Sequence, residues 1–211
     1  MKYLFIDASE NLTHVQTGTE KDFNAKTIDT NRDFAAKITE ICDNMLKEAG
    51  WEKEDLTHLV VCTGPGSLTG LRVADGFLRT LAMVLNIPLI GIDLFKWSIQ
   101  TLADNSFEGE ARLVMPTLID KAFEVKCQLP QKSQAQPTLI EKKAISSDIK
   151  TFGIRYNHEF AERLDPTPEA LHKLIIEEAK SSKTGIDEIL KVLPLYIIPS
   201  QAERNFKGGD K

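Results

Sequence analysis

The sequence has few cysteines, few histidines and no surplus of positive charge, and each shortage excludes a class of protein. The three cysteines, Cys42, Cys62 and Cys127, lie far apart without a Cys-x-x-Cys spacing, which argues against a disulfide framework and a zinc site. No two of the four histidines stand three to five residues apart, so no helix presents an imidazole pair to a metal ion. Lysine and arginine number 26 against 31 aspartates and glutamates, a net charge of -5, which disfavours direct, high-affinity binding of nucleic acid.

Long apolar runs are also missing. The apolar run near the N-terminus stops at Asp7, too short for the core of a signal peptide or for a membrane span, so we expect a cytoplasmic protein. The 211 residues are 42% hydrophobic, which is typical of a soluble globular chain that buries roughly 70% of its unfolded surface.

Segments with strand and helix periodicity alternate through the first half of the chain. Thr30 stands three residues before Asp33, a capping-box spacing, and the helical pattern that follows ends at Gly50. The predicted order, βββαβαβα, is similar to one lobe of the actin-like ATPase superfamily. We expect strands near residues 2–6, 12–17, 23–28, 59–62 and 88–93, and helices over 30–50, 67–86 and 94–103.

A second, smaller lobe is predicted after the first. Residues 113–119 and 123–129 read as strands joined at Asp120 and Lys121, residues 131–138 as a loop, and residues 168–181 as a helix. The fold class is therefore α/β, two-lobed and actin-like, of the ribonuclease H-like kind. We expect a first lobe over residues 1–105, a reduced second lobe over 106–189, and a C-terminal segment, 190–211, that rejoins the first lobe.

The second predicted helix is too apolar for a helix with one buried face. Its charges, Arg72, Asp75 and Arg79, fall within about 60° of one another, and apolar residues cover an arc of about 180° opposite them. A surface helix needs a stripe of only about 100°, so the excess predicts a second burial partner. The alternative is that the second lobe or the C-terminal segment covers it. The first helix shows a similar excess.

A glycine-rich loop joins a strand to that second helix. Gly64 and Gly66 permit backbone conformations closed to other residues, and Ser67 can cap the helix. Amides at a helix N-terminus suit an anion, so one interpretation is a cradle for phosphate or a nucleotide. The other is a purely structural turn, because the loop lacks a Gly-Lys-Ser/Thr ending.

Asp7 ends the first strand, where actin-like ATPases place a carboxylate near metal and phosphate. Those enzymes usually follow it closely with glycine, whereas here Ala8, Ser9 and Glu10 follow. A turn or helix cap is the alternative role for this aspartate, and Asp120 raises the same question in the second lobe. Asp7, Ser9, Gly64, Gly66 and Ser67 are thus the candidate nucleotide- or phosphate-binding residues.

Residues 64–72, Gly-Pro-Gly-Ser-Leu-Thr-Gly-Leu-Arg, closely resemble the signature of the bacterial TsaB/YeaZ family at the same strand-to-helix turn. The resemblance extends to residues 6–9, 87–93, 119–120 and 194–197, and it is strong over residues 1 to about 100. It implies a paralogue of the enzyme TsaD that lacks its metal-binding histidine pair and has no catalysis of its own.

Family resemblance also implies partners. Such a protein binds TsaD and, with the ATPase TsaE, supports transfer of a threonylcarbamoyl group to the adenosine beside the anticodon of certain tRNAs. It contacts tRNA only through the complex, and any ATP or ADP with Mg²⁺ would lie at the complex interface. The open alternative is an actin-like kinase or ATPase that uses Asp7 and the loop over residues 64–70.

The resemblance further implies that the first two helices form a bundle with the partner, or a homodimer when TsaD is absent. This bundle would supply the second burial partner that the wide apolar arc predicts. The expected interface residues are Phe34, Ile38, Ile41, Met45, Val73, Phe77 and Val84.

Overall fold

The first half of the chain forms a mixed five-stranded sheet in the order β3-β2-β1-β4-β5. The computed structural model describes residues 1–30, 33–118, 120–146 and 148–195. β1 pairs antiparallel with β2 and parallel with β4, so an opening meander is extended by strands that return through helical crossovers. The strands are β1 (Tyr3–Asp7), β2 (Leu12–Gly18), β3 (Phe23–Asp29), β4 (His58–Gly64) and β5 (Leu89–Asp93).

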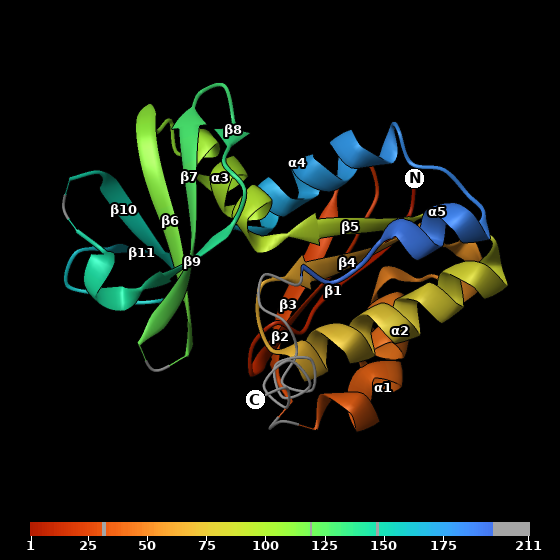
Figure 1. Cartoon of the computed structure of the whole chain (residues 1–211). Helices are drawn as coiled ribbons and strands as arrows, with labels where there is room; N and C mark the ends of the chain where they lie inside the picture. The colour runs from red at the N-terminus through yellow and green to blue at the C-terminus, as the bar shows by residue number, and fades with distance from the viewer. Residues whose placement is uncertain (31–32, 119, 147, 196–211) are drawn as a thin grey trace.

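Helices cover both faces of this sheet (Figure 1). Successive side chains of a strand point to opposite faces, and in β1 Leu4 and Ile6 join one core cluster while Tyr3 and Phe5 join the other. α1 and α2 pack on the face of Leu4, and α3 and α4 on the face of Tyr3. The helices are α1 (Phe34–Ala49), α2 (Leu68–Leu85), α3 (Leu94–Asp104), α4 (Pro168–Ala179) and α5 (Ile186–Lys191), with short 3₁₀ turns η1 (Lys53–Asp55) and η2 (Lys142–Ala144).

A second sheet, in the order β11-β10-β6-β7-β8, stands beside the first with α3 near their junction (Figure 1). One core cluster joins Phe5 and Trp97 of the first unit to Leu113 and Phe152 of the second sheet. The predicted α/β fold class with two lobes is confirmed. The strands are β6 (Gly109–Leu118), β7 (Lys121–Leu129), β8 (Ser133–Gln134), β9 (Thr138–Glu141), which pairs with β7, β10 (Lys150–Ile154) and β11 (Glu162–Leu164).

Two helix ends, the C-terminus of α1 and the N-terminus of α2, follow the capping residues in the sequence. Gly50 ends α1 in the left-handed conformation with φ 69°, and the Ser67 hydroxyl accepts the Gly70 N–H at the start of α2. The capping box at Thr30 is wrong: α1 begins at Phe34, and its N-cap is Asp33. Thr30 is buried just after β3, and its carbonyl accepts the Asp33 N–H at 2.9 Å.

The chain returns to the first sheet well before its end. The Tyr3 hydroxyl lies 2.8 Å from Nδ1 of His172 in α4, and the Trp97 indole N–H donates to the Thr167 carbonyl at 2.7 Å. α5 packs on α2 and β5. Two helices from the range 106–189 thus lie on the first sheet, and the division of the chain at 105 and 189 stays a prediction. Within the expected loop over 131–138, β8 forms two residues of strand, and residues 196–211 of the C-terminal segment lie outside the described part.

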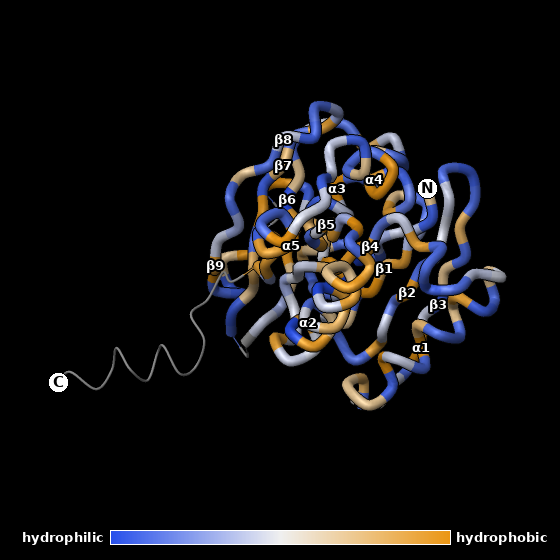
Figure 2. The backbone as a smooth tube through the Cα atoms, turned by 90° about the vertical axis from the view of Figure 1, so that its right-hand side faces the viewer, coloured by the Kyte–Doolittle hydropathy of each residue, from blue (hydrophilic) through white to orange (hydrophobic). Residues whose placement is uncertain are grey.

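Hydropathy follows this layering. Figure 2 shows apolar stretches gathered on the inner strands and helices, with hydrophilic stretches in the turns at the edges of the molecule. None of the helices in the described part of the chain is long and apolar enough to cross a membrane.

Candidate functional site

Asp7 lies at the carboxyl end of β1, with no exposed surface. Its Oδ1 accepts the backbone N–H of Ser9 at 2.8 Å, so the β1–β2 turn begins by folding back on this carboxylate. Asp7 and Ser9 are therefore brought together, as the sequence suggested. Asp120, the other candidate carboxylate, lies in an exposed turn between β6 and β7.

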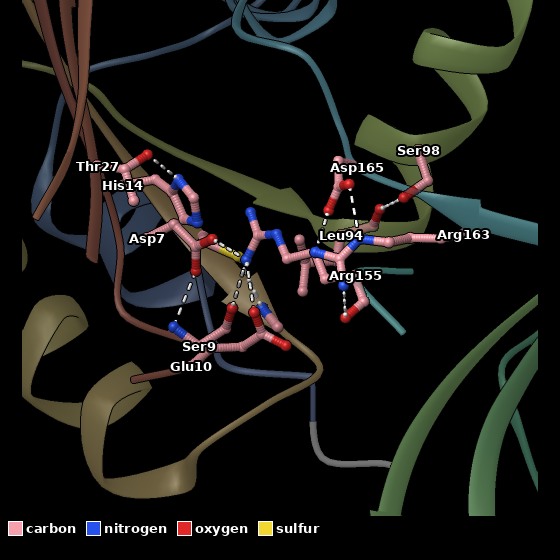
Figure 3. A network of polar contacts seen from close by, with 12 residues as sticks. Asp7, Ser9, Glu10, His14, Thr27, Leu94, Ser98, Arg155, Arg163 and Asp165 are labelled. Carbon is pink, nitrogen blue, oxygen red and sulfur yellow. Dashed lines mark hydrogen bonds and ion pairs between the residues drawn. The ribbon is translucent and has the colours of Figure 1, made fainter. Parts of the chain in front are cut away.

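Arg155, a residue that sequence reasoning missed, fills the space beside Asp7 (Figure 3). It follows β10 of the second sheet, and its Nη1 lies 2.9 Å from Asp7 Oδ2, 3.6 Å from Glu10 Oε2 and 3.5 Å from the Ser9 hydroxyl. Its guanidinium carbon lies 5.3 Å from the centre of the Trp97 ring, a cation–π distance. Only 6% of the Arg155 side chain is exposed, so both charges of the Asp7 pair are desolvated.

The electrostatics of Asp7 and Glu10 differ although both face the same guanidinium. Burial alone would raise the pKa of Asp7, but the charges of Arg155 and His14 and the hydrogen bonds from Ser9 together hold that pKa below its ordinary value. For Glu10, burial and the nearby Asp7 charge outweigh Arg155 and raise the pKa. Asp7 is therefore the more acidic of the two carboxyl groups beside Arg155.

These residues do not fit a metal-bound nucleotide. A cation already lies against Asp7, and the turn that follows places Ser9 and Glu10, rather than glycine, against the carboxylate. In residues 1–30, 33–118, 120–146 and 148–195, no group of three or more histidine, cysteine, aspartate or glutamate side chains could hold a metal ion.

The glycine loop packs on the β1–β2 turn. A Cβ at Gly66 would lie 2.4 Å from the Ser9 carbonyl oxygen, and one at Gly70 would lie 2.0 Å from the Ala8 carbonyl oxygen. The Ser67 N–H donates to the Ser9 carbonyl at 2.6 Å, so this amide is not available to a phosphate. These contacts support the structural interpretation of the loop: its glycines allow close approach of two backbones.

A cavity of about 310 Å³ adjoins the loop, between the first turns of α1 and α2. Ser67 and Thr69 line one side, but Glu10 lines another, and a carboxylate there opposes the binding of an anion. Gly64 and Gly66 are not among the residues that line this cavity. The five candidate nucleotide residues are thus close in space without forming a phosphate cradle.

The apolar stripe of α1, which we expect from the sequence to contact a partner, is buried within the chain itself. Its residues pack against β1, β4 and α2 in the chain's own core, where each is at most 7% exposed. The outward face of α1 is polar, with Glu40, Asp43 and Lys47 exposed. The four residues concerned are Phe34, Ile38, Ile41 and Met45.

α2 behaves differently on its two flanks. On one flank, Arg79 pairs with Asp75 at 2.8 Å and donates to the Val192 carbonyl beyond α5, so the C-terminal part of the chain covers this side, as the alternative held. Along the outward stripe, Val73 and Phe77 are only half-buried, and Val84 is 73% exposed. We call this stripe the α2 face; its members are Thr69, Val73, Gly76, Phe77, Thr80, Met83 and Val84.

Sequence comparisons match two groups of proteins in one biosynthetic process. A family model described as TsaD, tRNA N6-adenosine threonylcarbamoyltransferase, matches residues 28–118. The tRNA threonylcarbamoyladenosine biosynthesis protein TsaB of Bacillus subtilis is 37% identical over 68 residues, 31% of this chain and 28% of the relative. TsaB of Escherichia coli is 26% identical over 120 residues, 57% of this chain and 50% of the relative. In sequence, the chain is thus similar to TsaB proteins and to the TsaD family model.

Solved structures described as YeaZ, or as similar to it, share the fold of this chain. YeaZ from Pseudomonas aeruginosa superposes with a TM-score of 0.72 at 18% identity, over 92% of this chain and 99% of that one. A second Pseudomonas aeruginosa structure, described as similar to peptidase YeaZ, gives a TM-score of 0.75, also at 18% identity, over 93% and 99%. The matches span half or less of the length of the two TsaB relatives. At 18% identity, the YeaZ structures contribute the fold alone.

His14 makes a testable contribution to the pH dependence of stability. Burial, and next the charge of Arg155, lower the pKa of His14, so the folded chain binds this proton less readily than the unfolded chain. Stability should therefore be full above the unfolded pKa of about 6.5 and fall as the pH drops below it. We expect the urea midpoint to fall between pH 7.5 and 5.5, and His14→Asn to reduce that fall. An equal fall in both proteins would contradict this assignment.

Proposed function

We propose that this chain is a non-catalytic accessory subunit of the machinery that forms N6-threonylcarbamoyladenosine in tRNA. The observation that carries the proposal is the pairing of two features: Arg155 fills the place beside Asp7 where an actin-like enzyme would work, and the α2 face remains open. A chain with a filled site and an open apolar face is suited to binding a partner. The relatives named TsaB and the TsaD family model supply the process.

The proposed partner is the TsaD-type enzyme subunit, with the TsaE-type ATPase joining the complex. A net charge of -5 favours contact with tRNA through the partner rather than directly. When the partner is absent, we expect two copies of the chain to pair through the α2 face. A nucleotide with Mg²⁺ at the interface of the complex and a cytoplasmic location also remain predictions.

Gly76 lies at the centre of the α2 face, and its lack of a side chain suits close helix–helix contact. A Cβ at this position would meet no atom within 4 Å beyond the neighbouring backbone of its own helix, among the described residues. The flanking Val73, Met83 and Val84 supply apolar surface on either side. This arrangement of a small residue between apolar ones fits a partner helix that lies along α2.

Val84→Asp tests the interface without disturbing the core, because Val84 is 73% exposed. A charge buried against an apolar partner surface is costly, so affinity for the TsaD-type subunit should fall at least about tenfold. The measurement is isothermal titration with the TsaD-type subunit from the same genome, followed by reconstituted modification of tRNA. The modification should fall in parallel with binding.

Gln131→Asp is the matched control, since it adds the same charge at an exposed turn of the second sheet. It should bind like the wild type. Unchanged affinity for Val84→Asp would show that the α2 face is not the contact surface. Turnover of ATP by the isolated chain that is abolished by Asp7→Ala would instead favour the kinase or ATPase alternative.

A further inference from the structure

Arg155 has a backbone conformation that needs an explanation. Its φ is 51°, in the left-handed region that residues other than glycine rarely adopt. Its N–H donates to the Leu164 carbonyl at 2.8 Å, and its carbonyl accepts from Nη1 of Arg163 at 3.2 Å. Asp165 holds Arg163 in turn with two hydrogen bonds, of 2.7 and 2.8 Å. The surrounding structure therefore fixes a strained residue, which is a feature of functional positions.

The Arg155 side chain follows a strand of the second sheet, but its charged contacts are with residues of the first unit. A single nitrogen, Nη1, lies within 3.6 Å of Asp7, Ser9 and Glu10, at the end of β1 and in the turn that follows it (Figure 3). The guanidinium also lies over the ring of Trp97 in α3. Among the described residues, the ion pairs of Arg155 are the ones that connect β10 and the residue after it to the first sheet, since Lys150 pairs with Glu162. Arg155 thus connects the two sheets through charge.

Stability alone does not account for this arrangement. A buried ion pair contributes little net stability, because desolvation of the two charges offsets their attraction. Nη2 of Arg155 is buried and has no hydrogen-bond partner among the described residues, which adds a further cost. The Asp7 contact is an ion pair without the geometry of a directed hydrogen bond, so the guanidinium acts there chiefly as a positive charge.

The Arg155 guanidinium lies beside Asp7, at the site whose residues do not fit a metal-bound nucleotide. Asp7 ends a buried parallel strand beside the N-terminus of α2, where a carboxylate could hold a divalent cation if the space were open. The guanidinium lies in that space. We propose that Arg155 is a built-in cation, which closes the junction of the two sheets without a ligand and bars a divalent cation with its nucleotide phosphates from Asp7.

The proposal can be tested on the isolated chain, so its outcome is independent of any partner. Spin labels at Thr39→Cys in α1 and Lys126→Cys in β7 would report the distance between the two units, since both positions are exposed. The native cysteines Cys42, Cys62 and Cys127 are buried and leave the introduced thiols as the reactive ones. The measurement is the distance distribution by double electron–electron resonance.

We expect a single narrow distribution in the chain with Arg155 intact, unchanged by millimolar Mg²⁺-ATP. Arg155→Met should broaden it and shift it, because the charge that joins the sheets is lost. Arg155→Lys keeps a positive charge and should remain closer to the parent chain. Should Arg155→Met fail to fold, Asp7→Asn removes the other charge and should broaden the distribution in the same way.

Lys150→Met is the control, since Lys150 lies on the same strand but pairs with Glu162 at the surface. It should leave the distribution unchanged. The proposal is overturned if Arg155→Met keeps the parent distribution, or if Arg155→Lys broadens the distribution as much as Arg155→Met does. It is also overturned if Mg²⁺-ATP shortens the distance in the parent chain.

Discussion

Gly70→Ala should destabilise the chain by about 3 kcal/mol, because the added methyl group would meet backbone rather than a movable side chain. Its Cβ would lie 2.0 Å from the carbonyl oxygen of Ala8, so either α2 or the β1–β2 turn must shift. That shift would also disturb the bond from the Ser67 N–H to the Ser9 carbonyl. The free energy of unfolding, from urea titration followed by circular dichroism, measures the loss.

Gly76→Ala is a matched control in the same helix. Beyond the neighbouring backbone of α2 itself, a Cβ at Gly76 meets no described atom within 4 Å, so this change should stabilise α2 by about 0.5–1 kcal/mol through the better helix propensity of alanine. If both substitutions gave the same sign, the close approach of Gly70 to the turn would not be what fixes this loop. A partner-binding defect in Gly76→Ala without loss of stability would in addition support the α2 face as the interface.

The order of elements could be predicted because it depends on signals that are local in sequence. Gly50 ends α1, Ser67 caps α2, and Asn86 ends α2 in the left-handed conformation, each through contacts within a few residues. The predicted helix start at Thr30 is wrong because a capping-box spacing does not reveal which other contacts the residue makes in the fold. Here Thr30 is buried just after β3, and its carbonyl accepts the Asp33 N–H.

The burial of the two apolar helices was half predictable, because the width of an apolar arc says how much surface must be buried but not which part of the chain buries it. For α1, the sheet and α2 take the whole arc, including Phe34 and Met45. For α2, Ile189 and Val192 in and beyond α5 take one flank, although they stand about a hundred residues later. Only the stripe around Val84 is left exposed, and tertiary packing decided that difference.

The site beside Asp7 was the least predictable feature. Asp7 and Ser9 could be singled out because they end a strand, but their partner Arg155 stands 146 residues after Ser9. A single arginine after a short strand matches no sequence motif. The sequence distinguishes Arg155 only as the one charged residue within residues 151–156. The choice between a phosphate cradle and a structural turn therefore required the fold.

Asp7→Leu should cost about 3–5 kcal/mol of stability at pH 7, because it leaves the buried Arg155 charge without its closest partner. Asp7 is fully buried and Arg155 is 6% exposed, so water cannot take over the role of the carboxylate. Glu10 stays 3.6 Å away but is 34% exposed, and it compensates only in part. Because the folded pKa of Asp7 is lowered, its contribution is present above the unfolded pKa and is lost as the pH falls through the folded value. The gap between the variant and the wild type should therefore narrow in acid.

The double variant Asp7→Leu/Arg155→Met separates charge from packing. Apolar side chains of similar volume can replace a buried ion pair with little net loss, so the double variant should regain most of the stability that Asp7→Leu loses. Glu162→Leu is the surface comparison: its pair with Lys150 is exposed, and its loss should cost at most about 1 kcal/mol. If the double variant were as unstable as the sum of its single variants, Asp7 and Arg155 would be acting independently, and the charge pair could not be what joins the two sheets.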